Sequence, residues 1–260
     1  MQVLNSKDNI NIKNAVKLKK SAKYRRETGL FIAEGVRLCT DAMKSGAQIT
    51  MFFATEDASL RYAEDFAALS SYAEKTCLVS KELFAHIGDT QSPQGFLCVI
   101  KTLDKNCQFD TIKDSGKFLA LDNVQDPNNL GAILRTAEAF GVSGVILSDD
   151  CCDVYNPKVV RGSMGAVFRL SFMSVNRLSC FFEDNPNLNT YAAVVGMEAD
   201  SVTQTDFSEP CAVVIGNEGN GIRPQTLSAC RHKITIPMAG RAESLNASVA
   251  AAVLIWEMVK

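Results

Sequence analysis

The sequence has no excess of positive charge, because its 27 lysines and arginines are outnumbered by 29 aspartates and glutamates. With a net charge of −2 it is not a small, uniformly basic nucleic-acid module, so any contact with a polyanion must be local. No stretch approaches the roughly 18 consecutive apolar residues of a membrane-spanning helix, and MQVLNSKDNINIK lacks the apolar core of a signal peptide. We therefore expect a soluble, cytoplasmic protein with no membrane partner.

Metal-ligand spacing and a disulfide framework are also missing. None of the nine cysteines forms a Cys-x-x-Cys pair or lies at metal-binding spacing from His86 or His232. The odd number of cysteines, with Cys151 next to Cys152, is typical of a reducing compartment rather than of a secreted scaffold. We expect no metal site.

The 260 residues are enough for two domains, and a polar segment separates two regions of different pattern. The first hundred residues combine helical stretches, VRLCTDAMKSG and YAEDFAALSSYAEK, with strand-like ITMFFAT and GFLCVI. Residues 101–116 are polar and poor in large apolar side chains, which indicates a linker. We expect an N-terminal domain over residues 1–100 and a second domain over residues 117–260.

The second region predicts a parallel sheet. Short Val, Ile and Leu runs alternate with segments of helical period, as in strands covered by helices on both faces. These runs are KFLALDNV, GVSGVILSDD, TYAAVVGM, PCAVVIGNEG and HKITIPM. Ligands of such sheets bind beyond the carboxyl ends of strands, and polar clusters follow residues 121, 215 and 236.

The first cluster, DNVQDPNNLGAILRTAEAFG, allows a structural and a functional interpretation. Asn128 and Asn129 follow Pro127 at the start of a helix, where Asn is a common N-cap. Arg135 lies among apolar residues in the second turn of that helix. It either carries its charge out to solvent or points into a site.

The second cluster, VVIGNEGNGI, has glycines spaced G-x-x-G-x-G rather than the G-x-G-x-x-G of dinucleotide-binding loops. Pro224 also interrupts the helix that should follow such a loop, and we find no acidic partner for a ribose. A dinucleotide enzyme is therefore disfavoured. The loop is either a tight exposed turn or a close backbone approach to a ligand, with Glu218 at its centre.

The third cluster, PMAGRAESLNAS, leads into an amphipathic terminal helix. Its apolar positions recur at helical spacing: Leu245, Val249, Val253, Trp256 and Val259. Ser244 is the predicted N-cap, and Asn246 lies in the first turn. Alanines at 250–252 indicate that this helix packs closely against another surface.

Positive charge is concentrated near the N-terminus. A run without an acidic residue before Glu27 contains Lys13, Lys17, Lys19, Lys20, Lys23, Arg25 and Arg26. Such a run is commonly a solvated helical face, but it is also the most cationic stretch available for contacts with phosphates.

Taken together, the three clusters resemble a known family. DNVQDPNNLGAILRTAEAFGV, VVIGNEGNGI and ITIPMAGRAESLNASVAAAVLIWE are similar, in order and spacing, to the signature motifs of the SpoU (TrmH-type) RNA ribose 2′-O-methyltransferases of the SPOUT superfamily. RGSMGAVFRLSF also resembles this family. Residues 10–100, with FIAEGVRL and QSPQGFLCVI, resemble its N-terminal RNA-binding domain.

The resemblance implies a fold that the residue pattern alone does not predict. It is an α/β domain with a SPOUT-type parallel sheet and a C-terminal trefoil knot, preceded by a small α/β RNA-binding domain. The pattern alone predicts an ordinary doubly wound sheet, because true knots are very rare. The implied methyl donor is S-adenosylmethionine, bound mainly by backbone groups at Gly216, Ile236 and Leu245.

The resemblance also implies catalytic roles. Arg135 assists deprotonation of the ribose 2′-OH, and the site is completed by Asn129, Glu218, Ser244 and Asn246. A guanidinium is a poor base. Two versions therefore remain open: a desolvated Arg135 accepts the proton transiently, or its charge stabilises the developing alkoxide.

The implied partners are RNA and a second copy of the chain in a homodimer. RNA contacts are assigned to Lys19, Lys20, Arg26 and Arg161. An extra N-terminal domain suits a large folded RNA, which favours rRNA over tRNA. A non-catalytic RNA-binding protein with the same fold is the alternative of a different class, and the intact motif residues argue against it.

Overall fold

The computed structural model describes residues 2–103, 115–196, 198–208 and 210–260. The chain divides into two compact units. The first comprises Met1–Leu103 and Asp153–Phe168, and the second comprises Asp104–Cys152 and Arg169–Lys260. Most of the predicted linker, residues 104–114, lies outside the described residues.

The first unit contains a five-stranded sheet in the order β1-β4-β3-β5-β2. Its strands are β1 (Gln2–Leu4), β2 (Leu30–Glu34), β3 (Ile49–Thr55), β4 (Thr76–Val79) and β5 (Phe96–Lys101). β1, β3 and β4 pair in parallel, whereas β5 runs antiparallel to both β2 and β3. The predicted strands ITMFFAT and GFLCVI are therefore confirmed as β3 and β5.

Two groups of helices cover this sheet. α1 (Ile10–Lys20) and α6 (Lys81–Ile87) share an apolar core with one face of the strands. α3 (Val36–Lys44), α4 (Glu56–Arg61) and α5 (Ala63–Tyr72) pack against β3 and β5. Because side chains alternate along a strand, neighbouring Phe52 and Phe53 point to opposite faces of the sheet. Phe53 joins the apolar core shared with α1 and α6, and the Phe52 ring packs at a tilt against Phe66 of α5.

Residues 153–168, inside the predicted second domain, pack within the first unit. Their anchor is Arg25, a buried residue of α2 (Ala22–Thr28), which pairs with Asp153 at 2.7 Å and donates to the carbonyl of Leu18. Tyr155 packs its ring on Phe31, with centroids 4.5 Å apart. α9 (Pro157–Gly162) lies against β2.

The second unit contains a seven-stranded sheet in the order β10-β12-β9-β11-β6-β7-β8, with every pairing parallel. Its strands are β6 (Lys117–Leu121), β7 (Gly144–Ser148), β8 (Phe172–Val175), β9 (Asn189–Ala193), β10 (Asp200–Ser201), β11 (Cys211–Ile215) and β12 (His232–Thr235). All five predicted apolar runs form strands of this sheet.

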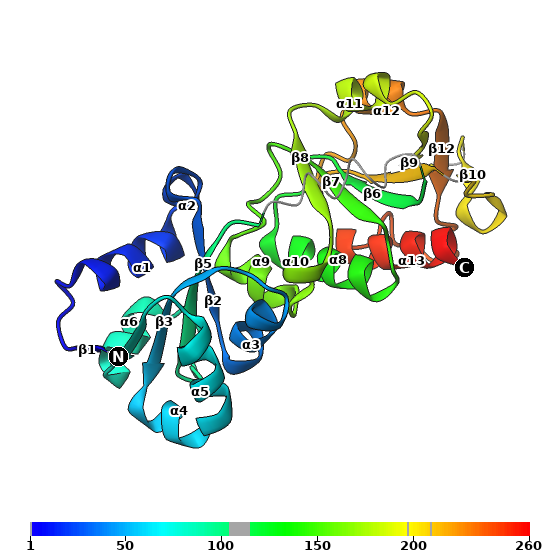
Figure 1. The fold of residues 1–260 in the computed structure, drawn as a ribbon. Coiled ribbons are helices and arrows are strands. Elements are labelled where there is room, and N and C mark those ends of the chain that lie inside the picture. The colour runs from blue at the N-terminus through cyan, green and yellow to red at the C-terminus, as the bar shows by residue number, and fades with distance from the viewer. Residues whose placement is uncertain (1, 104–114, 197, 209) are drawn as a thin grey trace. The chain divides into compact units, whose positions relative to one another are not determined.

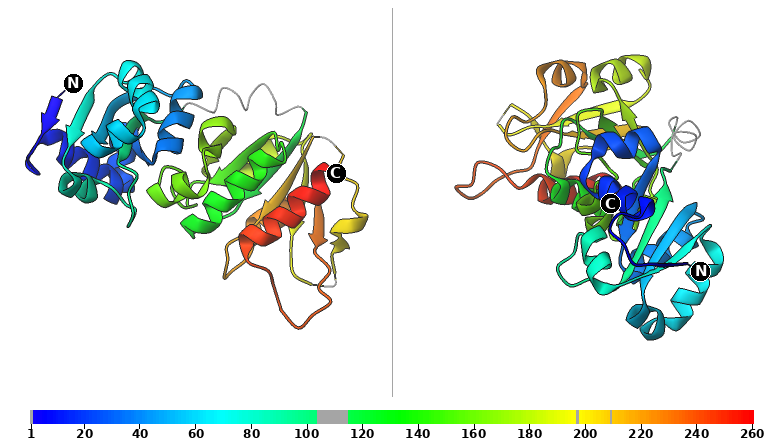
Figure 2. Two further views of the ribbon diagram at one scale, coloured as in Figure 1. Left: turned by 90° about the horizontal axis from the view of Figure 1, so that it is seen from below. Right: turned by 90° about the vertical axis from the view of Figure 1, so that its left-hand side faces the viewer.

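Helices cover both faces of the seven-stranded sheet, as the uninterrupted apolar runs predict (Figure 1). α8 (Pro127–Ala139) and α13 (Ala247–Val259) lie side by side on one face (Figure 2). α11 (Leu178–Asp184) and α12 (Pro224–Ala229) pack together on the other. The predicted parallel sheet is confirmed. No helix among the described residues is long and apolar enough to cross a membrane.

The helix caps differ from the sequence-based prediction. Asp126 caps α8, since its carboxylate accepts from the backbone N–H groups of Asn128 and Asn129. Neither Asn is therefore the N-cap. Asn246 rather than Ser244 caps α13, because the chain enters the helix two residues later than predicted and the Asn246 side chain accepts from the backbone of the first turn.

Pro224 starts α12 rather than interrupting a helix. Proline suits the first helical position, where no hydrogen bond is expected of its nitrogen. The glycine-rich loop after β11 therefore does lead into a helix, although its glycine spacing remains unlike that of a dinucleotide loop.

Candidate functional site

Three predicted site residues from separate segments are joined by hydrogen bonds. Asn129 Nδ2 donates to Glu218 Oε1, and Asn246 Nδ2 donates to Asn129 Oδ1, each at 3.0 Å. Asn129 is buried at the start of α8, Glu218 lies on the loop after β11, and Asn246 caps α13. The Asn129 amide is thus held between two loops that meet only in the folded chain.

The Glu218 carboxylate also accepts from the backbone N–H groups of Gln125, at 3.2 Å, and Asp126, at 3.1 Å. Burial acts to raise the pKa of Glu218, but the hydrogen bonds from Asn129 and from backbone amides outweigh it and leave the pKa below its ordinary value. Glu218 therefore carries its charge at neutral pH and ties the loop after β11 to the segment before α8.

The loop carrying Glu218 is closed tightly on itself. A Cβ atom at Gly216 would overlap the backbone of Gly221 and Ile222, so only glycine fits at position 216. Asn217 Oδ1 accepts from the backbone N–H groups of Gly219 and Asn220, both at 3.0 Å. The close backbone approach expected from these glycines occurs within the loop itself.

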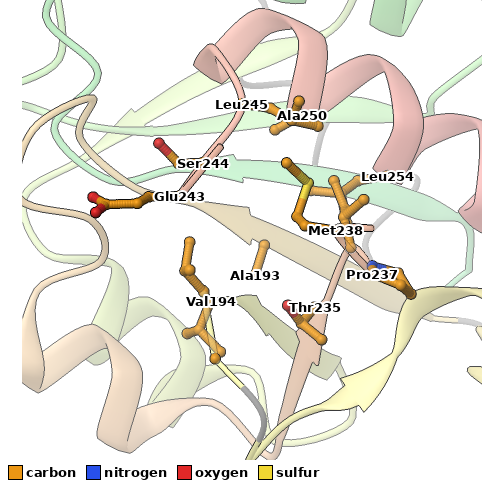
Figure 3. A pocket seen from close by; sticks show the side chains of 13 residues that line it. Ala193, Val194, Thr235, Pro237, Met238, Glu243, Ser244, Leu245, Ala250 and Leu254 are labelled. Carbon is orange, nitrogen blue, oxygen red and sulfur yellow. The ribbon is translucent and has the colours of Figure 1, made fainter. Parts of the chain in front are cut away.

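A pocket of about 450 Å³ opens where the chain leaves β9 and β12 (Figure 3). Its lining residues are Ala193, Val194, Val195, Gly196, Thr235, Ile236, Pro237, Met238, Glu243, Ser244, Leu245, Ala250 and Leu254. Three predicted residues, Ile236, Ser244 and Leu245, lie in this wall, whereas Gly216 is not among its lining residues. The volume is that of a small-molecule site.

The lining fits S-adenosylmethionine in two respects. Met238, Leu245 and Leu254 form an apolar wall for a flat base and an aliphatic chain (Figure 3). Between described residues, no backbone hydrogen bond outside helices and strands uses residues 236–245. Among the described residues their C=O groups, and their N–H groups apart from Pro237, therefore remain available to a polar ligand, as the predicted backbone-mediated binding requires.

Arg135 is exposed on α8, while its neighbours Leu130, Ile133, Leu134 and Ala137 are buried. Within the described part of the chain its guanidinium has no hydrogen bond or ion pair, and nothing there joins it to Asn129. The helix thus presents an available positive charge on the side away from the sheet.

The predicted RNA contacts have unequal environments. Lys19 Nζ donates to the carbonyls of His86, at 2.8 Å, and Gly88, at 2.6 Å. Arg161 pairs with Asp89 at 3.0 Å. Lys20 and Arg26 are exposed.

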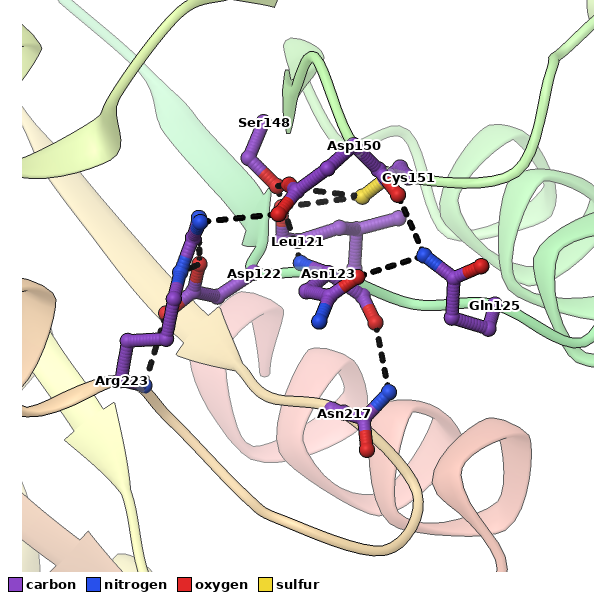
Figure 4. Close-up of polar contacts among 9 residues, drawn as sticks. All are labelled: Leu121, Asp122, Asn123, Gln125, Ser148, Asp150, Cys151, Asn217 and Arg223. Atoms are coloured by element: carbon purple, nitrogen blue, oxygen red, sulfur yellow. Dashed lines mark hydrogen bonds and ion pairs between the residues drawn. The ribbon is translucent and has the colours of Figure 1, made fainter.

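Sequence reasoning missed a charged cluster beside the site (Figure 4). Asp122, immediately after β6, is fully buried and pairs with Arg223, which also pairs with Asp150 at 2.8 Å. The available signal was an acidic residue directly after an apolar strand. No group of three or more potential metal ligands is found among the described residues.

Fold and pocket define the second unit as a SPOUT-type α/β methyltransferase domain. The model of the SpoU rRNA Methylase family matches residues 116–256, and that of the MRM3-like substrate binding domain matches residues 9–98. The chain belongs to the SpoU rRNA methylase family.

Individual relatives agree with this assignment. The chain is 29% identical to 23S rRNA (guanosine(2553)-2'-O)-methyltransferase RlmP of Bacillus subtilis, covering 99% of both chains. Its fold matches an AdoMet-bound rRNA methyltransferase from Sinorhizobium meliloti, with a TM-score of 0.86, 27% identity and coverage of 99% and 97%. It also matches the SpoU methyltransferase AviRb from Streptomyces viridochromogenes in complex with AdoMet, with a TM-score of 0.86, 25% identity and coverage of 96% and 97%.

These comparisons confirm the predicted family, the α/β fold with its parallel sheet, and the enzyme class, an S-adenosylmethionine-dependent RNA methyltransferase. The roles of individual residues stay predictions.

Proposed function

We propose that the protein methylates a ribose 2′-hydroxyl of ribosomal RNA in the cytoplasm. The observation that carries this proposal is the Asn246–Asn129–Glu218 network, because the residues preceding Asn246, Ser244 and Leu245, line the pocket that fits the methyl donor. The relatives named as 23S rRNA 2'-O-methyltransferases support the substrate class.

Methyl transfer to a hydroxyl requires alignment and loss of a proton. When bound, S-adenosylmethionine supplies an electrophilic methyl group on a sulfonium. Asn129, Glu218 and Asn246 hold the loops of the site in fixed register, which favours alignment. Of the two roles left open for Arg135, its exposure and available charge favour stabilisation of the developing alkoxide, with the hydroxyl proton passing to water.

The trefoil knot is part of this proposal. β12 pairs with both β9 and β10, two strands that follow one another in the chain. β12, which comes later in the chain, therefore lies between β9 and β10, and residues that follow β9 and β12 line the pocket. This order of strands supports a knotted segment between β12 and α13.

We include a homodimer formed through α8 and α13. Three large apolar side chains are exposed on this part of the unit: Phe140, Val249 and Trp256. Phe140 and Trp256 contact each other edge to face, with centroids 5.6 Å apart. A cluster of exposed aromatic residues is typical of a protein interface.

The N-terminal unit is proposed to bind RNA. The match to an MRM3-like substrate binding domain over residues 9–98 supports this role. The contacts predicted from the sequence are Lys19, Lys20, Arg26 and Arg161. Lys20 and Arg26 are the better candidates, since Lys19 and Arg161 already have protein partners.

The test is Arg135→Ala, assayed on rRNA from cells lacking the gene, with ribose methylations mapped. We expect turnover to fall about a hundredfold or more, as when one oxyanion donor is removed, with S-adenosylmethionine affinity within a few fold of wild type. Arg177→Ala, which changes an exposed arginine of the same unit, is the matched control. A wild-type protein that methylates tRNA instead would transfer the proposal to tRNA, and one that binds RNA without methylating it would refute catalysis.

A further inference from the structure

We propose that Arg223 is a positioning residue that holds Glu218 in place through two paths of hydrogen bonds. Its catalytic consequence rests on the function proposed above, whereas its structural consequence does not. Arg223 lies at the start of α12, five residues after Glu218, and forms no hydrogen bond with it.

The first path runs through Asp122. Its carboxylate has no exposed surface and receives the Arg223 backbone N–H at 2.9 Å and Nε at 2.7 Å, with a further ion pair from the guanidinium (Figure 4). Removing the partner of a buried carboxylate strongly destabilises the folded protein, because it leaves a buried charge unpaired. Arg223 therefore fixes the end of the 216–223 loop against the residue that follows β6.

The start of this loop is fixed as well. Gly216 allows the backbone of Gly221 to approach closely, and Asn217 Nδ2 donates to the carbonyl of Asn123 at 2.8 Å. Glu218 lies between two anchored ends. Release of the Arg223 end is therefore expected to move the carboxylate.

The second path runs through Asp150, which follows β7. Arg223 pairs with the Asp150 carboxylate at 2.8 Å, and the Asp150 backbone carbonyl accepts from the Gln125 side chain (Figure 4). Gln125 in turn donates its backbone N–H to Glu218. Arg223 thus braces both the loop that carries the carboxylate and the segment that donates to it.

The first readout needs no catalytic activity. We expect Arg223→Met to speed hydrogen exchange at the amides of Gln125 and Asp126, which donate to Glu218. Arg231→Met is the matched control, because Arg231 follows α12 and donates to Asn189 instead. Unchanged protection of both amides in a folded Arg223→Met protein would overturn the proposal.

The second readout is a double-mutant cycle on turnover with Glu218→Gln. With Glu218 unchanged, we expect Arg223→Met to lower turnover about a hundredfold, because a displacement of catalytic groups by about 1 Å lowers the rate by roughly that factor. S-adenosylmethionine affinity should stay within a few fold of the wild type. In the Glu218→Gln background, Arg223→Met should lower turnover by a much smaller factor, because both substitutions act through the position of the Glu218 carboxylate. Equal fold-losses in the two backgrounds would overturn the positioning role.

Arg223→Lys covers the case in which Arg223→Met does not fold. Lysine keeps a charge beside Asp122 but cannot reach Asp122 and Asp150 together with a planar fork. We expect it to fold and to show intermediate exchange at Gln125, and wild-type exchange would count against the proposal. If the wild type methylates no RNA, the proposed function fails, and the exchange experiment still decides the role of Arg223.

Discussion

The cationic run over residues 13–26 contains side chains that are bonded within the protein and others that are exposed and able to contact phosphate. The salt dependence of RNA binding can distinguish the two kinds. Lys20, Lys23 and Arg26 are exposed, and Lys23 lies 3.8 Å from Glu27. Lys19, by contrast, donates to two carbonyls at the end of α6. Burial is the main cause that lowers the pKa of Lys19. We therefore predict different behaviour for neighbours in the same run.

Each phosphate neutralised on a single strand or duplex releases about 0.7 to 0.9 of a counterion. Changing Lys20, Lys23 and Arg26 together to Gln should therefore lower the log–log salt slope of RNA binding by about 2 to 3. Over a roughly fourfold rise in salt, the wild type should lose about 20- to 40-fold more affinity than the variant. Lys19→Gln should leave the slope unchanged and lower the free energy of unfolding by about 1 kcal/mol, through lost hydrogen bonds.

The assay is the RNA dissociation constant across a salt series, with calorimetric S-adenosylmethionine binding as the control for an intact second unit. Equal slopes for the wild type and the triple variant would mean that these side chains do not touch phosphate. The run would then be a solvated face. A flatter slope for Lys19→Gln would refute the structural assignment of Lys19.

Three further predictions concern the second unit. Asn129→Ala should lower turnover about a hundredfold. It should lower the melting temperature less than Asp126→Ala does, because Asp126 caps α8. An Asn129→Ala protein that loses thermal stability but keeps wild-type turnover would contradict this. The folded-state pKa of Glu218 lies below its ordinary 4.5, so its contribution to stability is present above that pH and is lost as pH falls through the lowered pKa. The free energy of urea unfolding should fall less with decreasing pH in Glu218→Gln than in the wild type. Identical pH profiles for the two proteins would refute this contribution of Glu218. Trp256→Ser should shift the proposed dimer towards monomer in light scattering, and a monomeric wild type at micromolar concentration would end the dimer proposal.

The sequence alone determined five of the seven strands of the second unit's sheet, and the family of the chain. The five Val, Ile and Leu runs predicted five strands, because a strand buried on both faces is apolar along its whole length. This property can be read from each short segment without knowledge of the rest of the fold. The order and spacing of the three motifs identified the family before any contact was known. Two strands of this sheet, β8 and β10, were not predicted from the sequence. FMSV of β8 is a short run, and Asp200–Ser201 of β10 has polar side chains that do not indicate a strand.

Only the tertiary structure decided which residues of the site touch. Asn129 and Glu218 are 89 positions apart, and Asn246 lies 117 positions beyond Asn129, so their contacts depend on the order of strands in the sheet. The same holds for Arg223 and Asp122, separated by 101 positions. A charged or amide side chain looks the same in a sequence whether it is solvated or buried against a partner. Its role is set by the hydrogen-bond groups that the fold brings to it from elsewhere in the chain.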